Sequence, residues 1–401
     1  MVMRILNAPR RRLISEQSAS SGRRLSCYRE SHPHDPDWYR HGQDNDGHAG
    51  GPRTGMRSGS SALRIGVTMS TSRTTARSAG RDESLRWYPF ALGLGGLAGA
   101  WRTAAGFGAP TWPATGLTML CAAAWLAVTV RYVFHGGWKA RSFIADLRHP
   151  EQGFAVGYLT VIPMLLLAQV AQYTHLYRMV DLGVVAAWAL TTAALVAHWI
   201  TAPRERHTIH PGFSLPVVAG PFIASISLQA NGWHMFAQGS FALGAFFWMV
   251  FGTVIIGRLM TEQPLSSARF PTMVTLMVPP ATASNAWFTL NGNRITTLSI
   301  GLAAMLAMMA LIQLFILPDY LRHPFTISAW VFSFPLASTA NTVGRWACAE
   351  PYPGIRMLAW ATLTIATMII GIMLVRTGWM VGRTIQSKAV PPRTVTVSAL
   401  R

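Results

Sequence analysis

Apolar residues gather in ten runs between about Trp87 and Arg383, each near the length that crosses a bilayer. We place the predicted membrane spans at roughly 87–105, 114–134, 154–173, 180–200, 213–231, 234–256, 271–290, 296–317, 325–344 and 357–379. Prolines inside these runs fall only in the odd-numbered ones, at Pro89, Pro163, Pro216, Pro221, Pro279, Pro280 and Pro335. An interior proline removes an amide donor and displaces the carbonyl four residues earlier, so the pattern predicts kinked odd helices with unpartnered backbone oxygens.

Hydrocarbon cannot satisfy such oxygens, so broken helices are tolerated where they are buried in protein or line a wet cavity. The sequence therefore predicts an all-α polytopic membrane protein with five helical hairpins. The odd helices lie inside around a central path, and the even helices lie outside against lipid. Residues 1–86 form a basic N-terminal extension, residues 87–383 the transmembrane domain, and residues 384–401 a C-terminal tail.

The charge pattern indicates how the chain lies in the membrane. Only 12% of the 401 residues are charged and 51% are hydrophobic, yet the formal net charge is +19. Both tails are basic, and an even number of spans puts them on one side. The loops on that side hold nine basic residues against five opposite, so the positive-inside rule predicts cytoplasmic termini in a cell membrane. This distribution gives no reason to expect nucleic-acid binding.

Residues 1–86 are rich in Arg, Ser, Gly and His and have almost no apolar periodicity. Such a segment cannot bury a core, so we predict disorder. Two interpretations of it stay open, a regulatory or lipid-binding basic tail and a solvated extension. Met69 is a plausible alternative start, which would leave residues 1–68 outside the native protein.

Cofactor and metal chemistry finds little support in the sequence. Cys27, Cys121 and Cys348 have no metal-ligand spacing, and His198 and His234 form no facing pair in the spans. The glycine run at 93–99 lies inside the first span, where Gly95 and Gly99 predict close helix packing and not a nucleotide loop. We predict no cofactor and no metal.

Candidate transport chemistry lies in the odd spans, whose apolar stretches contain no Asp, Glu, Lys or His. This absence disfavours a cation pathway and tight proton coupling. Positive helix ends and hydroxyl groups remain for a permeating ion, and they favour a weakly bound anion. The candidate pore-lining hydroxyls are Ser214, Thr282, Ser333 and Ser338. Phe334 directly precedes Pro335, at the depth where kinked helices approach, and its ring could close a narrow pore by excluding water.

Several segments, in order and at matching spacing, resemble the TehA-like tellurite-resistance and dicarboxylate transporter family, which includes fungal malate and sulfite transporters and plant guard-cell slow anion channels. The segments are 99–102, 147–150, 211–216, Pro279 with 286–287 and 291–292, and 323–325 with Trp330 and 332–335. The resemblance implies ten helices in five hairpins, a central pore in each subunit of a homotrimer, kinks at Pro163, Pro216, Pro279 and Pro335, and a pore-blocking phenylalanine at Phe334.

The predicted function is an anion channel or transporter that moves small inorganic or organic anions across the cell membrane and is gated by Phe334. It is not an enzyme. The nearest alternative is a proton-coupled carrier of C4-dicarboxylate, sulfite or tellurite, and a membrane-embedded redox protein is the less favoured one. Among chloride, nitrate, sulfite, malate and tellurite, the sequence gives no preference.

Overall fold

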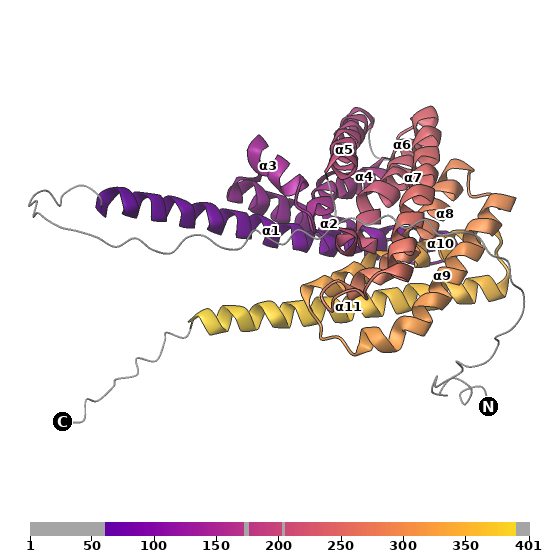
Figure 1. Ribbon diagram of the computed structural model, residues 1–401. Helices are drawn as coiled ribbons and strands as arrows, with labels where there is room; N and C mark the ends of the chain where they lie inside the picture. The colour runs from indigo at the N-terminus through magenta and orange to yellow at the C-terminus, as the bar shows by residue number, and fades with distance from the viewer. Residues whose placement is uncertain (1–60, 172–175, 203–204, 390–401) are drawn as a thin grey trace, which may run out of the picture. The chain divides into compact units, whose positions relative to one another are not determined.

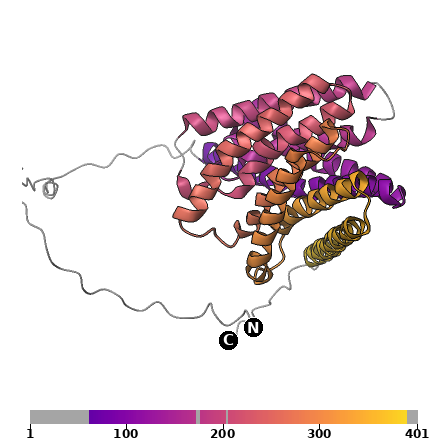
Figure 2. The ribbon, with the colours of Figure 1, turned by 90° about the vertical axis from the view of Figure 1, so that its right-hand side faces the viewer.

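The computed structural model describes residues 61–171, 176–202 and 205–389, and every regular element in these ranges is helical (Figures 1 and 2). This confirms the all-helical class. The α-helices of this part of the chain are α1 (Ser61–Ala104), α2 (Trp112–Tyr132), α3 (Ala140–Leu147), α4 (Tyr158–Val170), α5 (Leu176–Thr201), α6 (Gly220–Ala230), α7 (His234–Thr261), α8 (Val278–Leu290), α9 (Thr297–Leu321), α10 (Ser333–Ala349) and α11 (Pro353–Ala389).

Short 3₁₀- or π-helices adjoin several of these helices. They are η1 (Ala105–Phe107), η2 (Val133–Gly137), η3 (Gly153–Gly157), η4 (Arg206–Thr208), η5 (Pro211–Phe213), η6 (Leu215–Ala219), η7 (Phe270–Met277) and η8 (Ile327–Phe332). η3, η6, η7 and η8 run directly into α4, α6, α8 and α10. These tighter or wider turns occur at the start of four predicted odd spans.

Seven helical runs of the described residues are long and apolar enough to cross a membrane, judged by length and composition. They are Trp112–Gly137, Gly153–Val170, Tyr177–Thr201, Pro211–Ala230, His234–Thr261, Thr297–Leu321 and Pro353–Arg383. The run Gly153–Val170 is 61% buried within the protein and Pro211–Ala230 is 83% buried, whereas the other five are 11% to 28% buried. The two buried runs fall at predicted odd spans, and the five exposed runs fall at the even ones.

Helix α1 begins at Ser61, well before the predicted start of the first span at Trp87. Its buried contacts explain why the segment just before the span is ordered. Arg81 Nε lies 2.8 Å from Asp146 Oδ2, and the Tyr132 hydroxyl donates to the same oxygen at 2.8 Å. Residues 1–60 lie outside the described residues, so disorder there stays a prediction.

The prolines lie at two kinds of position. Pro89 and Pro163 are inside α1 and α4. Pro279 and Pro335 are in the first turns of α8 and α10, where a missing amide donor costs little. The expectation that prolines occur only in odd spans was wrong, because α9 extends past its predicted end and contains Pro318.

Two backbone oxygens that proline leaves without an amide donor have indole partners. The Leu159 carbonyl, four residues before Pro163, accepts from Trp125 Nε1 of α2 at 3.3 Å. The Pro216 carbonyl lies five residues before Pro221 in a π-helical turn, and it accepts from Trp188 Nε1 of α5 at 3.1 Å. At these two positions the prediction of unpartnered oxygens was wrong, because tryptophans of neighbouring helices supply the missing hydrogen bonds.

Glycines let α1 approach α10 closely. A Cβ added to Gly93 would overlap Oγ and Cβ of Ser333, and one added to Gly96 would lie 3.0 Å from the Phe334 ring. The packing predicted for Gly95 exists, but against Leu165 of α4 and Cys121 of α2. A Cβ at Gly99 would meet Asn341 at an ordinary 3.7 Å, so the predicted tight contact there was wrong. The α1–α10 contact therefore depends on Gly93 and Gly96.

Candidate functional site

Four helical runs begin around one cavity of about 250 Å³. Each contributes a wall residue from its first three positions: Phe154 of η3, Gly212 of η5, Thr272 of η7 and Ser328 of η8. The first amides of a helix have no intrahelical acceptor, and the aligned peptide dipoles place partial positive charge there. The four helix starts therefore add partial positive charge around the cavity, which favours anions, while the amides of Gly212 and Thr272 already donate to His210 Nδ1 and to the Arg269 carbonyl.

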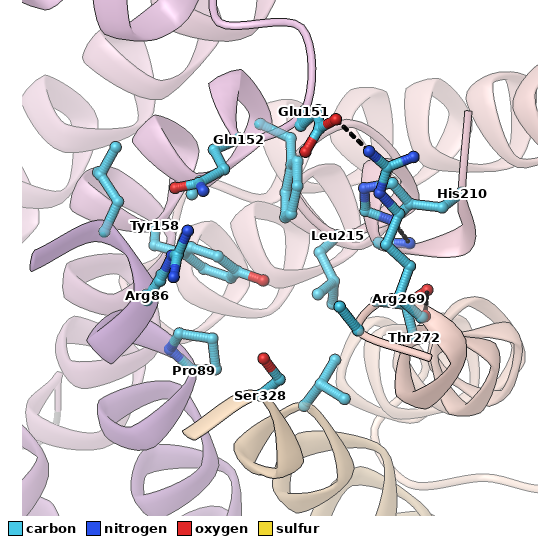
Figure 3. Close-up of a pocket in the computed structure, with 16 residues that line it drawn as sticks. Arg86, Pro89, Glu151, Gln152, Tyr158, His210, Leu215, Arg269, Thr272 and Ser328 are labelled. Atoms are coloured by element: carbon cyan, nitrogen blue, oxygen red, sulfur yellow. Dashed lines mark hydrogen bonds and ion pairs between the residues drawn. The ribbon is translucent and has the colours of Figure 1, made fainter. Parts of the chain in front are cut away.

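Two arginines face this cavity from opposite sides (Figure 3). Arg86 comes from α1, just before the membrane run, and its side chain is exposed. Arg269 directly precedes η7 and forms an ion pair with Glu151, which precedes η3. Two guanidinium charges and one carboxylate leave one net positive charge at the cavity wall.

His210 completes the side of the cavity near Arg269 without adding charge. Its ring is 4% exposed and lies between the rings of Phe154 and Phe213, with centroid distances of 5.4 and 4.8 Å. The amide of Gly212 donates to its Nδ1 at 3.2 Å. Burial lowers the pKa of His210 to about 4, because the interior disfavours the charged ring. His210 is therefore neutral near pH 7.

The cavity lies close to Phe334. Pro89 of α1 lines the cavity, and the carbonyl of Pro89 lies 3.4 Å from the Ser333 hydroxyl of α10. Gly93 and Gly96 follow Pro89 on the same face of α1, one and two turns further along. Gly96 contacts the Phe334 ring, which is 5% exposed. The face of α1 that begins at the cavity thus continues to Phe334.

The four predicted pore hydroxyls are all buried, at Ser214, Thr282, Ser333 and Ser338. Three donate to carbonyls of their own helical runs: Ser214 to Pro211 at 2.7 Å, Thr282 to Val278 at 2.7 Å, and Ser333 to Trp330 at 2.6 Å. The hydroxyl of Ser338 lies 3.1 Å from Nδ2 of Asn285, which links α10 to α8. The structure brings Phe334 and Ser333 together at the α1–α10 contact.

Sequence reasoning missed the charged residues of the cavity. Arg269 was counted only as a basic loop residue, and Arg86 and Glu151 were not singled out. Arg86, Glu151 and Arg269 lie on three segments far apart in the chain. Their common signal is position, because each immediately precedes an odd span, and odd spans all start on the same side of a bundle.

The family described as SLAC1, voltage-dependent anion channel, matches residues 84–378. The chain belongs to this family. A curated relative is a tellurite resistance protein TehA homolog from Haemophilus influenzae, which is 23% identical over 300 residues that cover 73% of this chain and 88% of that protein. A second is the guard cell S-type anion channel SLAC1 from Arabidopsis thaliana, 26% identical over 190 residues, 46% of this chain and 33% of that protein.

Membership of the SLAC1 family confirms the resemblance inferred from the sequence, and it places the chain among channel and transporter proteins of membranes. The family match begins at Ser84 and ends at Gly378. It therefore includes Arg86 and Phe334, together with the starts of η3, η5, η7 and η8. The cavity described above belongs wholly to the SLAC1-family part of the chain.

Proposed function

We propose that the protein is an anion channel or transporter that moves small inorganic or organic anions across the cell membrane. The observation that carries this proposal is the convergence of four helix starts and Arg86 on one cavity close to Phe334. Helix starts and a guanidinium that has no carboxylate partner among the described residues attract anions without binding them tightly, because they supply no closed coordination shell. Rapid conduction requires this kind of weak site.

The proposed path continues from the cavity between the inner helices. Polar atoms support it: Oγ of Ser225, Oγ of Ser284 and Oδ1 of Asn285 are buried and lack a hydrogen-bond partner within the described chain. A buried polar atom without a partner is costly, so water would stabilise all three, and the two serine hydroxyls would also donate to a passing anion. In this proposal ten helices form five hairpins, with odd helices around the path and even helices against lipid, as the burial contrast suggests.

Phe334 is proposed as the gate of this path. Its ring is held between the Gly96 surface of α1 and its own helix α10, beside Ala337, whose Cβ would also be within 3.2 Å of a Cβ at Gly96. A large apolar ring in a narrow passage excludes water, and an ion then lacks hydration. The family resemblance adds a homotrimer with one path per subunit to the proposal.

The proton-coupled carrier remains as a second candidate because of one carboxyl group. Asp181 of α5 is fully buried, and its Oδ1 accepts from the Ser227 hydroxyl at 2.6 Å. The second oxygen, Oδ2, has no hydrogen-bond partner among the described residues. Ionisable groups at membrane depth serve proton relays in many transporters. Sequence reasoning overlooked Asp181 because it considered titratable residues of the odd spans only.

Reversal potentials of the full-length protein in planar bilayers test the proposal. Under a potassium chloride gradient we expect a reversal potential near that of chloride, because one net positive charge and four helix starts surround the cavity. An imposed pH gradient should leave it unchanged. A reversal potential near that of potassium contradicts anion selectivity. Uptake that follows the pH gradient and is lost in Asp181→Asn would instead support the carrier.

Both termini are proposed to be cytoplasmic. The N-terminal end of α1 and the C-terminal end of α11 extend from the same side of the helices, as Figure 1 shows. We expect a cysteine added at the C-terminus of a variant without native cysteines to resist impermeant maleimide in intact cells and to react after lysis. Labelling of that cysteine in intact cells would refute the orientation.

A further inference from the structure

The two arginines at the cavity are in different electrostatic states. Arg86 is exposed, and no described carboxylate or other hydrogen-bonding group pairs with it. The guanidinium of Arg269 is engaged by Glu151 through Nη2, and its Nη1 donates to the His207 carbonyl at 3.4 Å. The Arg269 side chain is 21% exposed, so an anion in the cavity could reach it if Glu151 were absent.

Local hydrogen bonds and charge favour the ion pair of Glu151 with Arg269. The backbone amides of Glu151 and Gln152 donate to Nδ1 of His149 at 3.2 and 3.1 Å, which fixes the turn that carries the carboxylate. The hydrogen bond from Arg269 lowers the pKa of Glu151 below its usual value, against the smaller opposing effect of burial. Glu151 is thus charged near pH 7 and remains a partner for the guanidinium.

The Glu151 carboxylate takes the place that a carboxylate from solution would take. Arginine binds carboxylates through planar, charge-assisted hydrogen bonds, so a small free carboxylate such as acetate has the same chemistry as the Glu151 head group. The cavity, at about 250 Å³, has room for such an ion beside Arg86. The arrangement resembles two anion subsites, with one open and one filled by the protein's own side chain.

We propose that the cavity contains two anion subsites. Arg86 attracts small carboxylates and other anions to the first, and Glu151 masks the second, at Arg269. This inference rests on the proposed anion transport, which it deepens by naming the recruiting residue and the side chain that limits recruitment. Removal of the Glu151 charge opens the second subsite. Removal of the Arg86 charge closes the first.

A purely structural role for the Arg269–Glu151 pair makes the opposite prediction. The pair joins the segment before η3 to the segment before η7. If it only held these segments together, then Glu151→Gln and Arg269→Gln would both destabilise the protein and lower its current. In the masked-subsite proposal the two variants differ in direction, because Glu151→Gln frees a cation and raises the current, whereas Arg269→Gln leaves the Glu151 carboxylate unpaired and lowers it.

Currents through full-length protein in planar bilayers, at low chloride concentration on the Arg86 side, provide the first test. We expect Arg86→Gln to reduce anion current by about tenfold, since charged mouths concentrate counter-ions by roughly this factor or more. Arg86→Lys should retain most of it and Glu151→Gln should increase it. Arg269→Gln should reduce it, because the Glu151 carboxylate is then unpaired and cancels the Arg86 charge. All differences should shrink at about 1 M salt, where the Debye length is about 3 Å.

Acetate-induced thermal stabilisation of the purified protein gives a second test that does not depend on transport. A ligand that binds the folded state raises the unfolding temperature with its concentration. Against fluoride at equal ionic strength, acetate should give a larger shift in Glu151→Gln than in unaltered protein, and a smaller one in Arg86→Gln. The double variant Glu151→Gln/Arg269→Gln should lose the larger acetate-induced shift expected for Glu151→Gln.

The outcomes separate this inference from the proposed function. Unaltered current and unaltered acetate shift in Arg86→Gln overturn the recruiting role, and a Glu151→Gln variant with equal or smaller current and acetate shift overturns the mask. If the unaltered protein shows the expected acetate shifts but passes no anion current, transport is refuted while both subsites stand. Equal elution volumes in size-exclusion chromatography show that each variant is folded.

Discussion

Phe334→Ala should raise the anion current of the protein by about tenfold or more, which corresponds to a conduction barrier lower by about 1.4 kcal/mol. The ring is 5% exposed and lies in the first turn of α10 against the Gly96 surface of α1. Its removal leaves an alanine in a layer where small residues already lie on both sides. Water can then enter, and a hydrated anion no longer has to shed its shell at this layer.

Phe332→Ala is the matched control for Phe334→Ala. Phe332 lies two residues earlier, at the end of η8, and its ring packs on Tyr320 with a centroid distance of 4.8 Å. We expect its removal to leave the current near that of unaltered protein at equal surface expression. The Phe334→Ala current should keep its preference for chloride over potassium. A current through Phe334→Ala that equals or falls below that of unaltered protein would contradict the gating role of Phe334.

Gly93→Ala should destabilise the folded protein by up to about 3 kcal/mol, the cost of forcing an extra methyl group into a packed contact. A Cβ at this position overlaps both Oγ and Cβ of Ser333. Rotation of the hydroxyl relieves only the first overlap, because the second involves an atom fixed to the backbone of α10. The two helices must therefore separate. The measurement is the thermal unfolding midpoint in detergent.

Two further variants make the Gly93 prediction specific. Gly116 of α2 has no neighbouring atom within 4 Å of an added Cβ, so Gly116→Ala should be neutral or slightly stabilising through helix propensity. The double variant Gly93→Ala/Ser333→Gly removes the overlapping hydroxymethyl group and should recover most of the loss, as a double-mutant cycle would show. An unchanged midpoint in Gly93→Ala would show that α1 and α10 do not pack as described.

Local patterns predicted the elements of this fold but not its contacts. Long apolar runs such as His234–Thr261 are evident from composition, because a bilayer demands a fixed length of apolar helix. The proline rule foresaw that the Leu159 carbonyl would lose its amide partner. It could not foresee the Trp125 indole that replaces this partner, because Trp125 lies on another helix.

In the candidate site, too, the sequence indicated local features but not contacts between distant segments. Phe334 was proposed from its place before Pro335 and from the family resemblance, both local in sequence. The pairing of Glu151 with Arg269 joins residues more than a hundred positions apart, and nothing near either residue indicates it. Asp181 was missed for a different reason, because only the odd spans were considered for titratable residues. Asp181 lies on an even span, and its carboxylate accepts a hydrogen bond from Ser227 of an odd one.

Helix α1 carries Arg86, Pro89, Gly93 and Gly96 along one face, from the cavity wall to the Phe334 ring. Helix α1 continues through Pro89 without a break, so in the proposed channel a single helix connects the cavity to the gate. In that proposal a displacement of α1 at the cavity would also displace the Gly96 surface that contacts the Phe334 ring. In the proposed channel, anion binding at the cavity and opening of the gate would therefore be mechanically coupled through one helix.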